Sequence, residues 1–186
     1  MSLTPINSGW IEGICGTMFS GKTEELIRRL RRAQIAKMST TIFKPLFDTR
    51  YSDTQIVSHN QMKMDSRLVK SSAEILPLSQ DSKVVGIDEA QFFDDDLLPI
   101  CKELASNGAR VIVAGLDTDY RGLPFGPMPE LMCEADYLDK LRAICVKCGN
   151  PATYTQRRTK DSEQILIGET DIYEARCRNC FEPPNE

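Results

Sequence analysis

Eight residues near the N-terminus constrain the fold more than any other part of the chain. The stretch GTMFSGKT (residues 16–23) has the frame Gly-x4-Gly-Lys-Thr, which is that of a phosphate-binding loop. The glycines of such a loop let the backbone curl, so that successive N–H groups point at phosphate oxygens. The following helix adds a dipole that favours an anion at its start. The loop therefore requires a strand before it and a helix after it.

The flanking sequence supplies both elements. Residues 9–15 are short, apolar and β-leaning, and predict a strand that runs into the loop. Residues 24–38 have an apolar stripe at helical spacing and predict an amphipathic helix. The expected buried face comprises Leu26, Ile27, Leu30, Ala33 and Ala36. The arginines of this helix indicate either a solvated face, which is the commoner case, or a patch that binds nucleic acid.

Strand and helix patterns alternate over the following hundred residues. The sequence predicts strands at residues 40–44, 66–70, 83–90 and 110–117, and a helix at 95–108 that ends at Asn107-Gly108. Residues 45–65 are polar and irregular, which indicates a functional or mobile loop. The alternation predicts an α/β, P-loop NTPase-like fold with a mainly parallel sheet flanked by helices.

Length and composition bound the class of protein. The 186 residues suffice for one ordinary domain with a small appendage, and 41% hydrophobic with 27% charged residues is typical of a soluble globular chain. A net charge of −4 argues against a function that requires binding to a nucleic acid polymer. No apolar run approaches the roughly 20 residues that span a membrane, and the N-terminus lacks the pattern of a signal peptide. We therefore expect a cytoplasmic protein.

The seven cysteines fall into two groups. Three lie singly among apolar residues and are expected to be buried and inert: Cys15, Cys101 and Cys133. The other four form two Cys-x2-Cys pairs, Cys145 with Cys148 and Cys177 with Cys180. That spacing is typical of a tetrahedral Zn²⁺ site, and four thiolates close the coordination shell, which indicates a structural metal.

The pattern changes near residue 136, where short strands that carry the cysteine pairs replace the strand–helix alternation. We expect two units: a P-loop α/β domain over residues 1–135 and a small zinc-binding unit over residues 136–186. Residues 149–176, between the cysteine pairs, are expected to loop out from the second unit.

Acidic residues follow two of the predicted strands. One of Asp88 and Glu89 is expected to hold Mg²⁺ together with Thr23, which leaves the other free to act as a general base. Glu89 is alternatively an ordinary acid at a helix N-terminus. Asp117 and Asp119 are either metal ligands or turn formers.

Four landmarks occur in order along the chain. They are GTMFSGKT, DEAQFF (88–93), GLDTDYRGLPFG (115–126) and the two Cys-x2-Cys pairs. In this combination, from Trp10 to Cys180, the chain resembles the type II thymidine kinases, the zinc-containing cytosolic family. Tyr120 stands where many relatives have phenylalanine, and Gln61 where relatives often have glycine.

The resemblance implies an activity. It implies transfer of the γ-phosphate of ATP to the 5′-hydroxyl of thymidine, with deoxyuridine also accepted. Mg²⁺ would accompany ATP, and Zn²⁺ would be structural. Feedback binding of thymidine triphosphate and a homotetramer are further implications, whereas no partnership with a nucleic acid polymer or a membrane is expected.

The resemblance also assigns residues by position. Glu89 would be the catalytic base, and Thr23 with Asp88 would serve Mg²⁺. The ATP phosphates would be bound by Gly16, Thr17, Met18, Phe19, Ser20, Gly21, Lys22, Thr23, Asp48, Arg50, Asp88 and Gln91. The nucleoside would be bound by Met18, Phe92, Leu116, Tyr120, Phe125, Thr155, Ile165, Leu166, Ile167, Gly168 and Tyr173. The stretch between the cysteine pairs resembles the family's lasso, which closes over the nucleoside.

Three alternatives remain open from the sequence. One is another P-loop nucleoside or nucleotide kinase with a purine or cytidine preference. A second is a zinc-ribbon ATPase that binds nucleic acid. The third is a degenerate family member that senses nucleotides without catalysis, against which the presence of both Lys22 and Glu89 argues.

Overall fold

A six-stranded sheet forms the centre of the molecule. The computed structural model describes residues 8–46, 55–57, 63–159 and 172–184. Every neighbouring pair in the sheet is parallel, and the strand order is β5-β2-β6-β7-β1-β8. The strands are β1 (Trp10–Gly16), β2 (Thr40–Pro45), β5 (Arg67–Val69), β6 (Val84–Ile87), β7 (Arg110–Gly115) and β8 (Tyr137–Leu141). This arrangement confirms the predicted parallel α/β fold.

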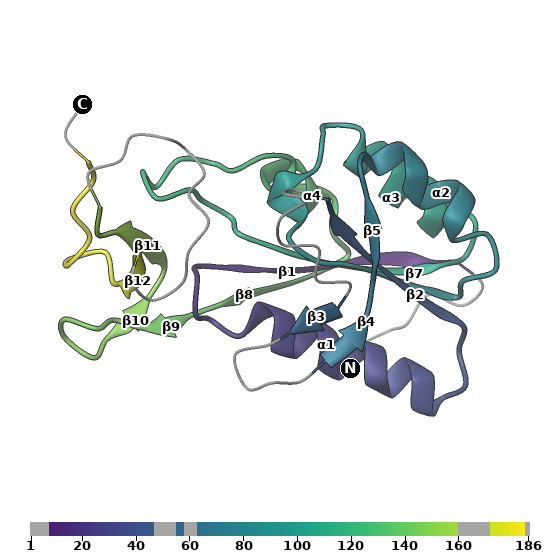
Figure 1. Cartoon of the computed structure of the whole chain (residues 1–186), viewed down its shortest axis with the longest axis horizontal. Coiled ribbons are helices and arrows are strands. Elements are labelled where there is room, and N and C mark those ends of the chain that lie inside the picture. The colour runs from purple at the N-terminus through teal and green to yellow at the C-terminus, as the bar shows by residue number, and fades with distance from the viewer. Residues whose placement is uncertain (1–7, 47–54, 58–62, 160–171, 185–186) are drawn as a thin grey trace.

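Helices cover both faces of the sheet (Figure 1). The helix α1 (Lys22–Ile35) lies on one face, and α2 (Ile75–Leu78), α3 (Leu97–Ser106) and α4 (Met128–Glu134) lie on the other. Successive residues of a strand point to opposite faces. Accordingly Ile112 of β7 belongs to the buried cluster that contains Leu30 of α1, whereas its neighbour Val113 belongs to the cluster that contains Leu97 of α3. The two hydrophobic layers therefore arise from the two-residue period of the central strands.

The strand order determines where the functional edge lies. In the sheet β7 separates β1 from β6, and all three strands run in the same direction. Their carboxyl ends therefore meet at one edge, which is where ligands bind in open parallel sheets. The phosphate loop after β1 and the acid pair after β6 lie on either side of the end of β7.

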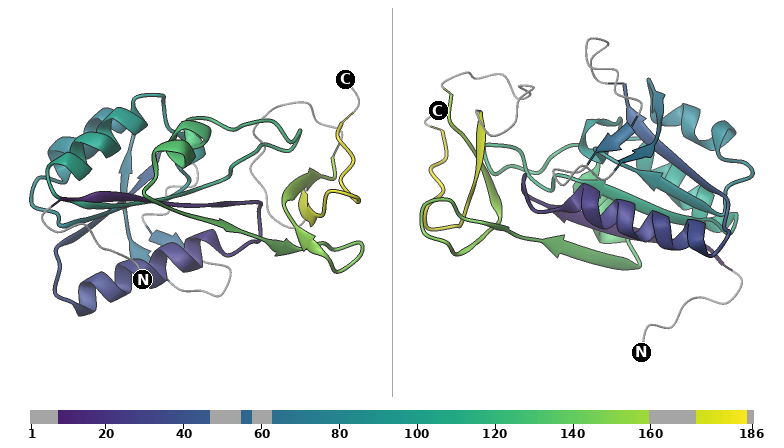
Figure 2. Two further views of the ribbon diagram at one scale, coloured as in Figure 1. Left: turned by 180° about the vertical axis from the view of Figure 1, so that it is seen from behind. Right: turned by 60° about the horizontal axis from the view of Figure 1, so that its bottom comes forward.

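A small unit built from two antiparallel ribbons extends from one end of the sheet (Figures 1 and 2). One ribbon pairs β9 (Ala143–Ile144) with β10 (Pro151–Ala152). The other pairs β11 (Tyr154–Arg157) with β12 (Tyr173–Arg176). The strand β8, which was expected to belong to this unit, pairs with β1 in the central sheet. We propose that the boundary between the two units follows Leu141 and not residue 135.

Several local predictions were wrong or incomplete. Within the region expected to be an irregular loop, β3 (Gln55–Val57) and β4 (Lys63–Asp65) form an antiparallel pair. The expected helix at 95–108 is confirmed as α3, whereas α4 had no counterpart among the predictions. Ala36, expected on the buried face of α1, is exposed because α1 ends at Ile35. Short 3-10 turns at Ser72–Glu74 (η2) and Ala90–Phe92 (η3) complete the described secondary structure.

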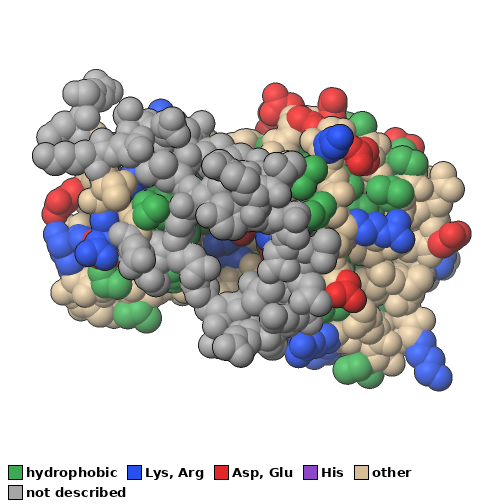
Figure 3. Space-filling view, viewed as in Figure 1, with side chains coloured by type: hydrophobic (Ala, Val, Ile, Leu, Met, Phe, Trp, Pro, Cys, Tyr) green, Lys and Arg blue, Asp and Glu red, His purple; other side chains and the backbone are tan. Residues whose placement is uncertain are grey.

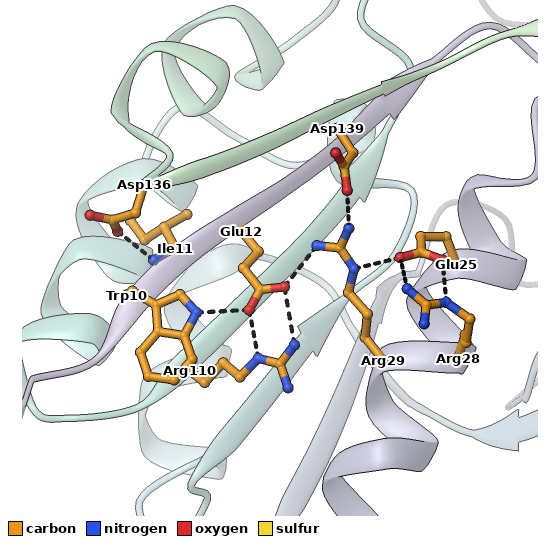
Figure 4. Close-up of polar contacts among 9 residues, drawn as sticks. All are labelled: Trp10, Ile11, Glu12, Glu25, Arg28, Arg29, Arg110, Asp136 and Asp139. Carbon is orange, nitrogen blue, oxygen red and sulfur yellow. Dashed lines mark hydrogen bonds and ion pairs between the residues drawn. The ribbon is translucent and has the colours of Figure 1, made fainter. Parts of the chain in front are cut away.

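A cluster of charges centred on the buried Arg29 and Glu12 attaches α1 to the sheet (Figure 4). Arg29 of α1 is 9% exposed, and its guanidinium bonds to Glu12 at 2.7 Å, to Glu25 at 2.8 Å and to Asp139. Arg110 of β7 donates to the other side of Glu12 at 2.6 Å. Neither interpretation of the helix arginines, a solvated face or a nucleic-acid patch, holds for Arg29. Its guanidinium instead joins carboxylates from β1, α1 and β8.

Two surface properties bear on the class of protein. Acidic, basic and hydrophobic side chains are interspersed over the described part of the face shown in Figure 3. Among the described residues, none of the helices combines the length and the apolar character that crossing a bilayer requires.

Candidate active site

The loop between β1 and α1 has the curled backbone that its sequence predicts. Gly16 and Gly21 have φ angles of +141° and +86°, and Phe19 is left-handed as well, at +65°. A Cβ on Gly16 would lie 2.4 Å from the carbonyl oxygen of Leu141, so a larger residue does not fit there. Gly21 precedes the first residue of α1, and its carbonyl accepts the Glu25 N–H at 3.0 Å. The loop is therefore a backbone cradle at a helix N-terminus, which suits phosphate.

Two side chains fold back onto the loop backbone. The hydroxyl of Ser20 and the ammonium group of Lys22 both donate to the carbonyl oxygen of Thr17, at 2.7 and 2.8 Å. Burial lowers the pKa of Lys22, against the opposing effect of the Glu89 and Asp88 carboxylates. A phosphate group beside Lys22 would favour its charged form. The Lys22 site thus fits an anion.

Asp88 and Thr23 lie together, as expected for a pair that serves Mg²⁺. The Thr23 hydroxyl donates to Asp88 Oδ2 at 3.2 Å, and Asp88 is 5% exposed. Burial, followed by the neighbouring Glu89 carboxylate, raises the pKa of Asp88 to about 7. A divalent cation at this position would favour the carboxylate, and Mg²⁺ prefers oxygen ligands. The donor set therefore fits Mg²⁺.

Glu89 is held in an uncommon backbone conformation. Its φ of +52° is left-handed, and its N–H donates to Asp88 Oδ1 at 3.0 Å. Glu89 precedes the turn η3 but makes no side-chain capping hydrogen bond to it. Its carboxylate Oε2 instead accepts from Gln91 Nε2 at 2.6 Å. Glu89 therefore lacks the side-chain capping hydrogen bond to η3 that would favour its interpretation as an ordinary helix-terminal acid.

Gln91 was expected to contact the ATP phosphates. In the structure its side chain is engaged by the protein: it is 2% exposed, donates to Glu89 and accepts the Leu116 N–H at 2.9 Å. The contact of Gln91 with phosphate stays a prediction, whereas its contacts with Glu89 and Leu116 are present in the structure.

The two acids after β7 have different partners. Asp119 accepts the backbone N–H groups of Arg121 at 2.8 Å and Leu123 at 3.1 Å, so it is a turn former. Asp117 is 4% exposed and lies 2.6 Å from Lys140 Nζ, on β8. Sequence reasoning missed Lys140, because its position beside Asp117 depends on β7 and β8 flanking β1.

The expected nucleoside-binding residues come together in subsets. The rings of Phe92 and Phe125 meet edge to face with centroids 5.5 Å apart. The hydroxyl of Thr155, on β11, accepts the Met18 N–H at 3.1 Å and lies 2.7 Å from the Thr17 hydroxyl. Thr155 therefore connects the small unit directly to the phosphate loop.

Arg157 joins two of the expected nucleoside-binding residues and was not predicted. Its guanidinium carbon lies 3.6 Å from the centroid of the Tyr120 ring, a cation–π contact. The same guanidinium donates to the Tyr173 hydroxyl at 2.8 Å. The available signal was the two-residue period of β11, in which Thr155 and Arg157 share the buried face. A buried arginine in a short polar strand is not distinguishable from a solvated one by composition.

Six of the assigned residues lie outside the described part of the chain. They are Asp48, Arg50, Ile165, Leu166, Ile167 and Gly168. Their expected contacts with phosphate and nucleoside stay predictions.

The paired cysteines form one cluster. The sulfur atoms of Cys145, Cys148, Cys177 and Cys180 all lie within 4.8 Å of one another. Each pair sits on a tight turn: the Gly149 N–H donates to the carbonyl oxygen of Cys145 at 2.8 Å, and the Cys180 N–H to that of Cys177 at 3.0 Å. Sulfurs around a tetrahedral Zn²⁺ lie about 3.8 Å apart, given Zn–S bonds of about 2.3 Å. The cluster can therefore hold a structural metal.

The three single cysteines do not share one environment. Cys15 and Cys101 are buried as expected, and burial raises the pKa of their thiols to about 11 and about 12. The prediction for Cys133 was wrong, because this residue near the end of α4 is exposed.

The fold and the site together define a P-loop nucleotide-binding α/β protein with an attached four-cysteine unit. Residues 9–181 match the family model described as thymidine kinase. A thymidine kinase of Rhodothermus sp. (strain ITI 518) is 56% identical over 95% of this chain and 83% of the relative. Thymidine kinases of Bacteroides thetaiotaomicron and Bacteroides fragilis are 56% and 55% identical over 93% and 94% of this chain, and over 87% of each relative. The chain belongs to the thymidine kinase family.

Proposed function

We propose that the protein transfers the γ-phosphate of ATP to the 5′-hydroxyl of thymidine, and also accepts deoxyuridine. The observation that carries the proposal is the meeting of Lys22, Thr23, Asp88 and Glu89 at one edge of the sheet, in a member of the thymidine kinase family. A cradle for phosphate, a pair of oxygen ligands for Mg²⁺ and a separate carboxylate are the parts that phosphoryl transfer to an alcohol needs.

The phosphate chemistry assigns a task to each group. The backbone of residues 16–23 binds the triphosphate, Lys22 neutralises charge on the outer phosphates, and Thr23 with Asp88 holds Mg²⁺. The bound Mg²⁺ supplies charge neutralisation on the phosphate oxygens. Asp48 and Arg50 are proposed to lie near the phosphates as well, with Arg50 stabilising charge on the transferring group.

Glu89 is proposed as the general base. Its carboxylate takes the proton of the 5′-hydroxyl while that oxygen forms a bond to the γ-phosphorus. The bond from the γ-phosphorus to the bridging oxygen breaks in line, and ADP leaves with the electron pair. The protein contributes chiefly through positioning and charge neutralisation.

The nucleoside is proposed to bind next to the phosphate loop. The wall residues from the main domain are Met18, Phe92, Leu116, Tyr120 and Phe125, and those from the small unit are Thr155, Tyr173 and residues 165–168. The contact of Thr155 with Met18 and the contacts of Arg157 with Tyr120 and Tyr173 support this placement, because they join the two units beside the loop. Bound Zn²⁺ would fix both ends of the segment 149–176.

The acceptor can be tested directly. The purified protein, with ATP and Mg²⁺, is offered thymidine, deoxyuridine, deoxycytidine and deoxyadenosine in competition, and the monophosphates are quantified. We expect thymidine monophosphate to dominate, followed by deoxyuridine monophosphate. Preferential phosphorylation of a purine nucleoside or of deoxycytidine would assign another kinase specificity. ATP hydrolysis that DNA stimulates, without nucleoside phosphorylation, would support the nucleic-acid ATPase alternative.

Two further properties that the family resemblance implies are proposed with this function. Thymidine triphosphate would inhibit by occupying the nucleoside and phosphate sites together, and the protein would assemble as a homotetramer. Inhibition kinetics and sedimentation analysis measure these properties independently of the acceptor assay.

A further inference from the structure

The amide of Gln91 is enclosed in the protein directly behind the proposed base. Its side chain is 2% exposed, and it connects Glu89 after β6 with Leu116 after β7. Leu116 N–H is a donor and requires an acceptor, so the carbonyl oxygen of the Gln91 amide must face it. The NH2 group must consequently face Glu89. The orientation of this amide is thus determined by a backbone group and not by the carboxylate that it contacts.

Two glycines pack closely against Gln91. A Cβ on Gly115 would lie 2.9 Å from Gln91 Oε1 and 2.7 Å from the sulfur of Met128. A Cβ on Gly126 would lie 2.2 Å from the backbone oxygen of Gln91. Gly115 and Gly126, at the two ends of the segment 115–126, therefore both pack against Gln91, in addition to its hydrogen bonds.

The donor that faces Glu89 matters because of the strain in that residue. Glu89 has a left-handed φ of +52°, and its side chain makes its 2.6 Å hydrogen bond with Gln91. A carboxylate on a long side chain loses orientation when such a partner is removed. A misplacement of about 1 Å in a reacting group can cost about 10²-fold in rate.

We propose that Gln91 is a positioning residue for Glu89, and that it ties the base to the segment 115–126 that carries Leu116, Tyr120 and Phe125. The inference rests on the proposed function, since it needs Glu89 to be the base. The segment 115–126 is thereby linked through one amide to the carboxylate that receives the 5′-hydroxyl proton. Gln91 itself touches neither phosphate nor nucleoside in this role.

The test is a double-mutant cycle with Gln91→Met and Glu89→Gln, measured by single-turnover phosphorylation of thymidine. Methionine has the length of glutamine and fills the enclosed space without polar atoms. We expect Gln91→Met to lower the rate of phosphoryl transfer about 10²-fold in the wild-type background, while the dissociation constant of ATP changes less than about 2-fold. In the Glu89→Gln background the same substitution should change the rate less than about 2-fold, because a residue that acts through Glu89 has nothing further to position.

Two results would overturn the inference. One is wild-type activity in Gln91→Met. The other is an equal loss in both backgrounds, which would indicate a general structural role. Gln34→Met, on the exposed side of α1, is the matched control and should retain full activity. A wild-type protein that does not phosphorylate thymidine at all would instead reject the proposed function, so the two failures are distinguishable.

Discussion

At the scale of single residues, a few positions of the candidate site have strained backbone angles or buried charged side chains. Phe19 and Glu89 are left-handed without being glycine, and such conformations cost of order 1 kcal/mol each. Burial raises the pKa of Asp88 to about 7 and lowers the pKa of Lys22, so it disfavours the charged form of both groups. These departures lie next to one another at the carboxyl ends of β1 and β6, where a charged ligand would compensate for them.

Substitution of the proposed base should separate chemistry from binding. We expect Glu89→Gln to lower thymidine phosphorylation about 10³-fold, within the range of general base catalysis. ATP and thymidine should still bind, because glutamine has the size of glutamate and keeps an oxygen that can accept from Gln91. Rapid-quench kinetics and equilibrium binding measure the two effects, with Glu103→Gln on the exposed face of α3 as control. Retention of most activity would remove Glu89 from the role of base.

At the scale of elements, α1 is attached to the sheet by charges as well as by apolar side chains. Its Leu26, Ile27 and Leu30 are buried against the sheet, while Arg29 reaches Glu12 on β1. Glu12 also accepts from the Trp10 indole at 2.7 Å (Figure 4). Because α1 begins in the phosphate loop, these contacts set the direction in which its N-terminus points.

The carboxylates of this cluster should contribute stability that is lost in acid. Hydrogen bonds from Arg28 and then from Arg29, against the effect of burial, hold the pKa of Glu25 at about 2, below its usual 4.5. Burial by itself would raise the pKa of Glu12. Hydrogen bonds from Arg110 and Trp10 outweigh this effect, so the pKa of Glu12 is lowered. A folded-state pKa below the unfolded one stabilises the fold above about pH 4.5, and that stabilisation is lost as the pH falls toward 2.

Thermal unfolding at several pH values tests this expectation. We expect Glu12→Gln to be less stable than the wild type by about 3 kcal/mol at pH 7, because two guanidinium groups lose a buried partner. Its melting temperature should also fall less steeply than that of the wild type between pH 5 and about pH 3. Glu134→Gln, in an exposed ion pair with Lys102, should follow the wild-type curve. Parallel curves for wild type and Glu12→Gln would show that Glu12 does not carry the acid sensitivity.

At the scale of the whole molecule, the small unit adds side chains to the candidate site at the edge of the sheet. Thr155 bonds to the phosphate loop, and Arg157 bonds or packs against Tyr120 and Tyr173. The four cysteines lie in the same unit, and Cys145 and Cys177 share a buried hydrophobic cluster with Ala152, which is next to β11 along the chain, and with Ala175 of β12. We expect the geometry of the cluster to determine how β11 and β12 are presented to the main domain.

Removal of one cysteine should therefore act on both stability and substrate affinity. We expect Cys148→Ser to release bound Zn²⁺, to lower the melting temperature and to raise the KM for thymidine by about 10-fold or more. Elemental analysis, calorimetry and steady-state kinetics measure the three effects. The exposed Cys133 lies outside the cluster, and Cys133→Ser should change none of them. A wild-type protein that contains no zinc when grown with zinc would contradict this account.

Much of the fold and of the site could be predicted from the sequence. The loop 16–23, the acid pair and the cysteine pairs are contiguous or closely spaced, so their chemistry is visible in the order of residues. The central strands could be recognised because both of their faces are buried, which makes them continuously apolar. The placement of β8 could not be predicted, because its three central residues are exposed at the sheet edge and residues 137–141 resemble a polar strand of the second unit.

By itself the sequence determined that a phosphate-loop motif follows β1, that carboxylates follow β6 and that four cysteines form two Cys-x2-Cys pairs, since these properties belong to short segments. Only the tertiary structure decided that the Gln91 amide contacts Leu116, that Lys140 meets Asp117 and that Arg157 contacts both Tyr120 and Tyr173. The physical reason is that each of these contacts joins strands or loops that are distant in the chain. Whether two such side chains come within contact distance depends on strand order and packing, which no local pattern of residues encodes.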